Sequence, residues 1–193
     1  MKKKALTKLA QSGSDVHVYY DLTLSLIKAH IQAIKHEIHL KKKGFIEFAD
    51  GYRLEHKGRA IERLAVSFSD YASFQDRVVI QEFLKLCLKS RFETVDSTND
   101  DHKKRVGELN RQVKKLQTAF RDLCAIDRSY KSPMPFLNCW FLSVPQLLVL
   151  LDECHDEDSF GRELKRTRNV TRMTLDYYQE YSSARGFGME AGE

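Results

Sequence analysis

The strongest constraint on this chain is a run of apolar residues whose spacing alternates between three and four. This alternation is the period of a coiled-coil helix, so residues 106–123 are predicted to form a helix with one apolar stripe. A second helix with the same spacing is predicted from Asp21 to about Lys43. The two stripes could pack antiparallel inside one molecule, or each could form a dimer seam. Their members are Val106, Leu109, Val113, Leu116, Phe120 and Leu123, and Leu24, Ile27, Ile31, Ile34 and Ile38.

The remaining segments also read mainly as helices. Ser143 followed by Val144-Pro145 is typical of a helix N-cap with proline in the first turn. Asp50-Gly51 between two short apolar segments favours a β-hairpin, with a structured loop as the alternative. Phe136 to Leu142 is expected to be a loop held on the core by Trp140. Further helices are expected at Gly58–Ala72, Phe74–Arg91 and about Ser159–Ser182.

Residues Asp15 to Tyr20 alternate between polar and apolar, directly before the first long helical pattern. In an extended segment, Val16, Val18 and Tyr20 would share one face, with Asp15, His17 and Tyr19 on the other. Asp21 would then cap the helix. A lone strand needs a partner, so this pattern predicts a β-ribbon formed with a second copy of the chain. The alternative is an ordinary edge strand or extended lead-in.

Composition indicates a soluble globular protein, because 42% of its 193 residues are hydrophobic and 31% are charged. No apolar run approaches the roughly 18 residues of a membrane helix. The basic N-terminus lacks the apolar core of a secretory signal, so we expect a cytoplasmic protein with no membrane partner. The four isolated cysteines are expected to act as small buried hydrophobes.

The formal net charge of +5 is unevenly distributed. Residues 1–43 and 102–121 are both strongly basic, whereas residues 93–101 and 152–158 are acidic. Basic segments of this kind suit a phosphate-bearing partner, although a charge run is often only a solvated helix face. The candidate phosphate contacts are Lys2, Lys3, Lys4, Lys114 and Lys115.

Catalytic signatures are weak. His36 and His39 lie three residues apart, whereas histidines of a zinc-binding helix are four apart. Residues 154–158 carry metal-compatible side chains, but consecutive positions cannot converge on one ion without special loop geometry, so a cap or solvated turn is favoured. We therefore predict a protein that is not an enzyme, with no cofactor, metal or small-molecule ligand.

The junction from Asp15 to Leu26 resembles the ribbon-helix-helix DNA-binding proteins. Together with Gly44–Phe48 and Phe136–Leu142, it is also similar to a family encoded in integrating conjugative elements and large conjugative plasmids, which includes the AcaB activator of plasmid transfer. This resemblance implies a dimeric activator whose paired strands read an operator, with Asp15, His17 and Tyr19 as base contacts. One departure is that residues 44–57 separate the first helix from any second one.

These observations predict a mainly α protein with a short N-terminal β-strand, in which a ribbon-helix-helix-like element is embedded in a helical domain. Residues 1–92 would form the DNA-binding and dimerisation region, residues 102–183 a helical region, and residues 184–193 a disordered tail. The expected function is a homodimeric, sequence-specific regulator that binds double-stranded DNA and activates conjugative transfer genes on a mobile element. The alternative is a non-enzymatic helical adaptor that binds a partner helix through the stripe from Val106 to Leu123.

Overall fold

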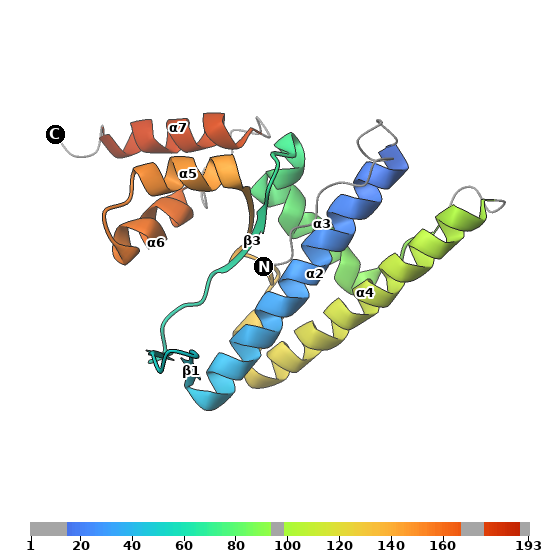
Figure 1. Ribbon diagram of the computed structural model, residues 1–193, viewed down its shortest axis with the longest axis horizontal. Helices are drawn as coiled ribbons and strands as arrows, with labels where there is room; N and C mark the ends of the chain where they lie inside the picture. The colour runs from blue at the N-terminus through green and yellow to red at the C-terminus, as the bar shows by residue number, and fades with distance from the viewer. Residues whose placement is uncertain (1–14, 94–98, 167–175, 190–193) are drawn as a thin grey trace.

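Two long helices lie side by side along the molecule and run in the same direction (Figure 1). The computed structural model describes residues 15–93, 99–166 and 176–189. Helix α2 spans Asp15–Lys43 and helix α4 spans Asp100–Ile126. Near their first turns, Tyr20 Oη donates a hydrogen bond of 2.7 Å to Glu108, and near their last turns Lys41 Nζ lies 2.6 Å from Asp127. The helices are therefore parallel, and the antiparallel arrangement expected as one alternative is wrong.

The apolar stripe of α4 is confirmed as a helix face and is buried inside the chain. Leu109, Val113, Leu116, Phe120 and Leu123 belong to one core cluster together with Ile27, Ile31 and Ile34 of α2. Leu84 of helix α3 (Arg77–Lys89) completes this core from a third helix. Because α2 and α3 cover the stripe, it is not available as an exposed seam for a partner helix.

Residues Asp15 to Tyr20 are the first turns of α2, not a strand. Each residue of a helix turns by about 100°, so position 17 does not lie on one face with positions 15 and 19 as it would in an extended ribbon. Asp21 is buried inside the helix and does not cap it. The predicted N-terminal strand is therefore wrong, because the same alternation is compatible with a helix whose buried side includes the polar residue His17.

Gly44 ends α2 as predicted, and a β-hairpin follows. Gly44 has a φ of +79°, a left-handed conformation that favours glycine, and its N–H bonds to Leu40 O. Strands β1 (Phe45–Glu47) and β2 (Arg53–Glu55) pair antiparallel, which confirms the hairpin. Gly51 takes a φ of +84°, and its N–H bonds to Phe48 O. The turn therefore uses one left-handed glycine, as in three-residue hairpin loops.

A second, parallel sheet joins distant parts of the chain. Strand β3 (Arg63–Ser67) pairs with strand β4 (Cys139–Ser143), with Leu64 opposite Trp140 and Val66 opposite Leu142. The helix predicted from Gly58 to Ala72 is therefore wrong at β3, and a short 3₁₀ helix, η1 (Ala72–Gln75), follows it. The aromatic segment from Phe136 to Leu142 was expected to be a loop. Its second half instead belongs to strand β4, in which every residue is buried.

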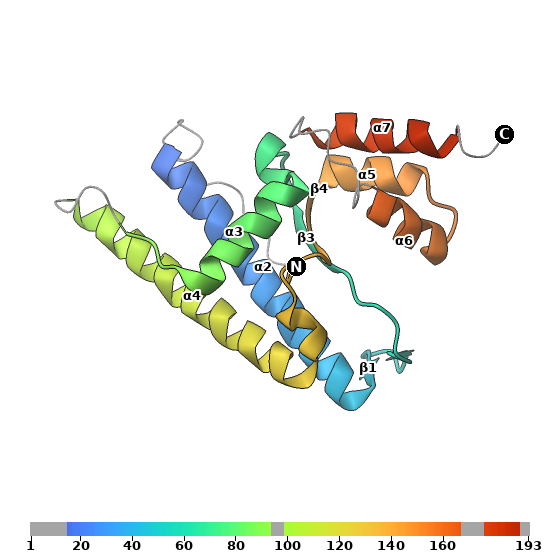
Figure 2. The same ribbon diagram turned by 180° about the vertical axis from the view of Figure 1, so that it is seen from behind.

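The β3–β4 sheet separates two apolar cores. On one face, Ala65 and Phe141 pack with α2, α3 and α4. On the other, Trp140 and Leu142 pack with helices α5 (Val144–Asp152), α6 (Glu157–Arg166) and α7 (Tyr177–Met189). Figures 1 and 2 show α5, α6 and α7 grouped on one side of the sheet and the α2–α4 pair on the other. Residues from both predicted regions, 1–92 and 102–183, thus contribute to the same apolar cores.

The observed ends of the later helices agree in part with the ends predicted from the sequence. Ser143 caps α5 in a capping box with Gln146, and Pro145 lies in the first turn, as predicted. The 3₁₀ helix η2 (Arg128–Lys131) connects α4 to the segment before β4. Residues 157–166 and 177–189 are helical, with Asp176 outside both helices, and residues 167–175 lie outside the described part of the chain. Residues 184–189, expected to be disordered, belong to α7, where Ala184 is buried.

Candidate nucleic-acid interface

The described parts of the two basic segments lie on neighbouring helices, α2 and α4. On α2, Lys28, Lys35 and Lys42 are exposed and are spaced seven residues apart, so they form one row along the helix. At about 1.5 Å per residue the row is about 21 Å long. On α4, Lys104, Arg111 and Lys115 are exposed and share the side of the helix that carries Glu108. We call these six residues the basic face.

Glu108 marks the seam at which the two rows meet. It accepts a hydrogen bond of 2.7 Å from Tyr20 Oη, and Lys28 Nζ lies 3.4 Å from its other oxygen. The Tyr20 hydroxyl, with support from the charges of Lys28 and Arg111, holds the pKa of this carboxyl below its usual range. Glu108 therefore stays ionised at neutral pH and offsets part of the positive charge of the two rows.

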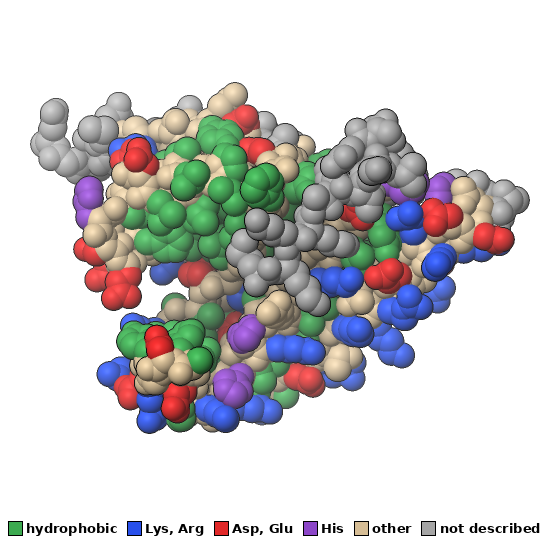
Figure 3. Space-filling model, in the orientation of Figure 1, with side chains coloured by type: hydrophobic (Ala, Val, Ile, Leu, Met, Phe, Trp, Pro, Cys, Tyr) green, Lys and Arg blue, Asp and Glu red, His purple; other side chains and the backbone are tan. Residues whose placement is uncertain are grey.

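The basic face is otherwise free of ion pairs in the described part of the chain. Lys35, Lys42, Lys104, Arg111 and Lys115 make no ion pair with another described residue. Figure 3 shows Lys and Arg side chains along both helices, with histidines between them on α2. Cations in rows on two neighbouring helices, with only Lys28 paired among the described residues, make a surface suited to a polyanion.

The outward face of α2 also carries polar side chains other than lysine. Gln32, His36 and His39 are exposed at spacings of four and three, so they form a line beside the lysine row. Glu37, which lies between these histidines in sequence, points the other way and is buried. The pair that resembled a weak zinc motif is thus a pair of surface histidines, and the carboxylate between them serves the core.

Glu37 anchors α2 to the sheet beneath the basic face. Its carboxylate accepts a hydrogen bond of 2.5 Å from Tyr130 Oη and lies 3.5 Å from Nε of the buried Arg63 on β3. Arg63 also donates to Asn138 Oδ1 at 2.6 Å, and Lys41 Nζ lies 3.5 Å from Glu37. This network joins α2, β3 and the segment before β4, and so fixes the outward face of α2 in position.

The structure separates the residues that sequence reasoning proposed as a site. His17 is buried at the start of the α2–α4 contact, with Nε2 3.7 Å from Asp101 Oδ2 and its ring 6.5 Å from that of His102. His17 is buried between two helices and is not exposed toward a partner, so its position gives no support to the predicted base contact. The side chains of Asp15 and Tyr19, and all of Lys2, Lys3 and Lys4, lie outside the described residues.

Lys114 and Lys115 are both exposed, but they differ in position. Lys115 lies on the basic face. Lys114 is turned by about 100° from Lys115 on the helix. It lies toward Asn110 and Gln117, which bond to Phe92 and Cys87 beside α3, and so it lies at the edge of the basic face nearest α3. Sequence reasoning missed Lys28, Lys35, Lys42, Lys104 and Arg111 as one group. The spacing of seven residues within each row was the sequence signal that could have identified them.

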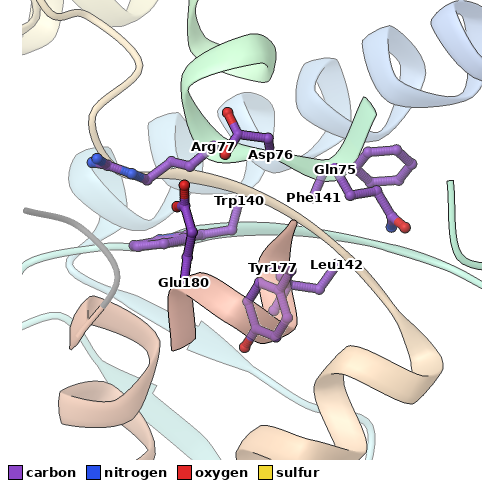
Figure 4. Close-up of a pocket in the computed structure, with 8 residues that line it drawn as sticks. All are labelled: Gln75, Asp76, Arg77, Trp140, Phe141, Leu142, Tyr177 and Glu180. Atoms are coloured by element: carbon purple, nitrogen blue, oxygen red, sulfur yellow. The ribbon is translucent and has the colours of Figure 1, made fainter. Parts of the chain in front are cut away.

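An enclosed pocket among the described residues is too small for a small-molecule ligand. A pocket near the β4–α7 contact is lined by Asp76, Arg77, Trp140, Tyr177 and Glu180 among others (Figure 4). Its inner free volume of about 20 Å³ suffices for about one water molecule. Burial raises the pKa of the Cys87 and Cys139 thiols to about 12, so both are protonated and unreactive at neutral pH.

Residues 15–93, 99–166 and 176–189 contain neither a candidate metal cluster nor a membrane-spanning helix. No group of three or more His, Cys, Asp or Glu side chains there is arranged to hold a metal ion. Residues 154–156 lie between α5 and α6, and Glu157 and Asp158 begin α6. Asp156 accepts a hydrogen bond of 2.6 Å from the Ser159 N–H in the first turn of α6, as expected for a cap. No helix in these ranges is both long and apolar enough to cross a membrane.

Comparisons with known proteins add no relative. No protein-family model matches the chain, and no curated protein or solved structure matches it significantly.

Proposed function

We propose that this protein binds double-stranded DNA through the basic face of α2 and α4. The observation that carries the proposal is the parallel packing of these helices, which gathers two basic segments about 60 residues apart in sequence onto one surface. The proposal keeps DNA as the partner suggested by the charge pattern. It replaces the ribbon by a pair of helices as the contact surface.

Phosphate contacts would supply most of the affinity. Each phosphate neutralised by a lysine or arginine releases condensed counterions, so the logarithm of the binding constant falls by about 0.9 per contact for each unit of log salt concentration. Six cations in contact would weaken binding by roughly a thousandfold between about 50 and 200 mM salt. This steep dependence distinguishes a phosphate-binding surface from a merely solvated one.

Base recognition would come from the outward face of α2. The major groove, about 12 Å wide, admits an α-helix, and glutamine and histidine carry donors and acceptors that can meet base edges. Gln32, His36 and His39 take the place of Asp15, His17 and Tyr19 as the candidate base contacts, with the lysine row beside them contacting a strand of the backbone. DNA binding of this kind supports a role as a transcriptional regulator.

The further role as an activator of conjugative transfer rests on the likeness to plasmid-encoded regulators alone. The ribbon that motivated a homodimer is replaced by the first turns of α2, so dimerisation has no structural support at this point. The adaptor alternative needed an exposed stripe from Val106 to Leu123, but most of that stripe is buried against α2 and α3. DNA binding is therefore the better supported of the two functions.

A salt titration with matched variants tests the proposal. Lys35→Gln combined with Lys115→Gln removes one charge from each row. We expect weaker binding to a random-sequence duplex and a salt slope lower by about 1.8, the loss of two contacts. Fluorescence anisotropy from about 50 to 200 mM salt gives both quantities. The control, Arg162→Gln with Lys165→Gln on α6, removes the same charge from exposed positions remote from the basic face.

Two results would refute DNA binding at this surface. One is the absence of duplex binding by the wild type at about 50 mM salt, where phosphate contacts are strongest. The other is an equal loss of affinity in the two double variants, which would indicate that only net charge matters.

Sequence specificity requires a separate selection experiment. The wild type is expected to enrich a motif from a pool of random duplexes. The variant Gln32→Ala/His36→Ala/His39→Ala should lose that preference, at about 1–3 kcal/mol per lost contact, while its binding to the unselected pool keeps the same salt slope. A variant that enriches the same motif would exclude α2 as the base-reading helix.

A further inference from the structure

Helix α5 exposes apolar side chains that its own chain does not cover. Leu148 is 59% exposed and Leu151 is 46% exposed, and Val149 is also exposed. Of the nine residues of α5, only Gln146 and Leu150 are buried. An isolated exposed leucine is ordinary, but a short helix that is apolar on nearly every side is not.

The strand beside α5 continues this apolar area. Val66 lies opposite Leu142 in the parallel register, so its side chain points to the same face of the sheet as Leu142, the face that α5 covers. Val66 is exposed, and Phe68, which follows β3, is exposed to 79%. Figure 3 shows a broad hydrophobic area over α5 and toward β3. We call Val66, Leu148, Val149 and Leu151 the α5 surface.

A groove borders this surface on the side of α7. It is open to solvent and is lined by Val149 of α5 and by Tyr181, Ser182, Arg185 and Gly186 of α7. The small residues Ser182 and Gly186 lie one turn apart on α7, which leaves space for a side chain from outside. The α5 surface is therefore a ridge with a receiving groove, a shape that can hold a helix.

The rim of the α5 surface is acidic. Directly after Leu151, the segment 152–158 contains Asp152, Glu153, Asp156, Glu157 and Asp158 and no lysine or arginine. All of these except Glu153 are exposed, and Glu153 pairs with Arg185 across the groove. At the other end, the exposed Asp70 lies 3.5 Å from Gln146 of α5. Acidic groups thus lie beyond both ends of the apolar area.

We propose that the α5 surface binds a partner protein through an amphipathic helix that has leucine-type residues on one face and lysine or arginine at its ends. The apolar face would cover Leu148 and Leu151, and the basic ends would lie beside Asp152–Asp158 and Asp70. Binding would remove the apolar side chains of the α5 surface from water and would bring opposite charges together at its rim. This partner site is separate from the basic face and from DNA binding.

The charges argue against two other occupants. A second copy related by a two-fold axis would place identical acidic rims close to each other, which is repulsive. An anionic lipid surface would likewise be repelled by the same carboxylates. A cationic helix is attracted to this region even though the whole chain carries a net charge of +5.

Two synthetic helical peptides test the proposal on the full chain. The first has leucines at i, i+3, i+4 and i+7 and lysines at both ends, and in the second the lysines are glutamates. We expect the lysine peptide to bind at least about tenfold more tightly than the glutamate peptide. Leu148→Gln combined with Leu151→Gln should weaken the lysine peptide by about tenfold or more. Asp152→Asn combined with Asp158→Asn should reduce the discrimination between the peptides.

The matched control changes exposed apolar residues elsewhere. Leu86→Gln with Met134→Gln replaces side chains that are 56% and 55% exposed on α3 and on the loop before β4. This variant should bind the lysine peptide as the wild type does, and circular dichroism verifies the fold of all variants.

Three outcomes would overturn the proposal. The peptides could bind equally, or the Leu148/Leu151 variant could bind like the wild type. Sedimentation could instead reveal a wild-type dimer that the same variant dissociates, in which case the occupant is a second copy. Failure of DNA binding leaves these outcomes unchanged, because the α5 surface lies on the other side of the sheet.

Discussion

At the scale of single residues, the ion pair of Glu37 and Arg63 is the costliest polar contact to break. Both side chains are at most 1% exposed. Glu37→Gln should therefore destabilise the protein by about 3–5 kcal/mol, because it leaves the guanidinium of Arg63 buried without its counter-charge. Urea denaturation measures the loss. Replacing both residues, Glu37→Leu with Arg63→Met, should recover much of it, and a double variant as unstable as the single one would contradict this account.

His30 predicts a dependence of stability on pH. It is fully buried beside Arg63, and burial, with a smaller contribution from the Arg63 charge, lowers its pKa to about 3. An unfolded histidine titrates near pH 6.5, so between about pH 6.5 and 3 the unfolded chain binds a proton that the folded protein excludes. Stability should therefore fall as the pH is lowered through this window, by up to about 1.4 kcal/mol per pH unit from this residue.

The variant His30→Met removes the titratable imidazole and replaces it with an apolar side chain of similar size. Urea denaturation at pH 7 and pH 5 should give a smaller difference for the variant than for the wild type. An unchanged difference would show that other groups cause the acid sensitivity. No sequence pattern marked His30, because a histidine in an apolar stripe is identified as buried only when the neighbouring strand is known.

At the scale of elements, α4 was predictable and β3 was not. A three-four spacing sustained over 106–123 specifies a helix in almost any environment. β3 has buried or half-buried residues on both faces, since one face meets α2 and the other meets the α5–α7 core. The strand thus lacks the polar alternation by which half-exposed strands are found. The direction of α4 relative to α2 depends on the whole connection 44–99, which no local pattern encodes.

Leu116 tests whether the stripe of α4 is a core or a seam between chains. It is fully buried among the helices of its own chain. Leu116→Ala should cost about 2–5 kcal/mol, through lost burial and the cavity left behind, and should leave the mass in solution unchanged. A variant of nearly normal stability that changes from dimer to monomer would instead identify the stripe as an intermolecular coiled coil.

At the scale of the molecule, the β3–β4 sheet couples the two cores. Because each strand carries side chains into both, neither core is complete when the sheet is lost. Leu84→Ala in one core and Leu164→Ala in the other should therefore lower the midpoint of the same unfolding transition. Far-ultraviolet circular dichroism and Trp140 fluorescence should give coincident curves in both variants. Separate transitions would mean that the α5–α7 region unfolds independently.

The basic face could be predicted only in part from sequence. The charge pattern indicated two basic segments, suggested DNA as a partner, and included Lys115. It could not bring Lys28, Lys35 and Lys42 next to Lys104 and Arg111, because their proximity follows from the parallel packing of α2 and α4. The α5 surface was even harder to predict from sequence, since the pattern of its leucines is equally compatible with a buried core helix.

The parallel arrangement of α2 and α4 also has a consequence during synthesis. The apolar side of α2 leaves the ribosome first, but its main cover, α4, follows only after residues 44–99 have been made. Residues 44–126 must be made before α4 is complete, so at about 5–20 residues per second α2 is without its full cover for roughly 4–17 s. The nascent chain thus presents Ile27, Ile31 and Ile34 to the cell for seconds, a period in which chaperone binding would compete with aggregation.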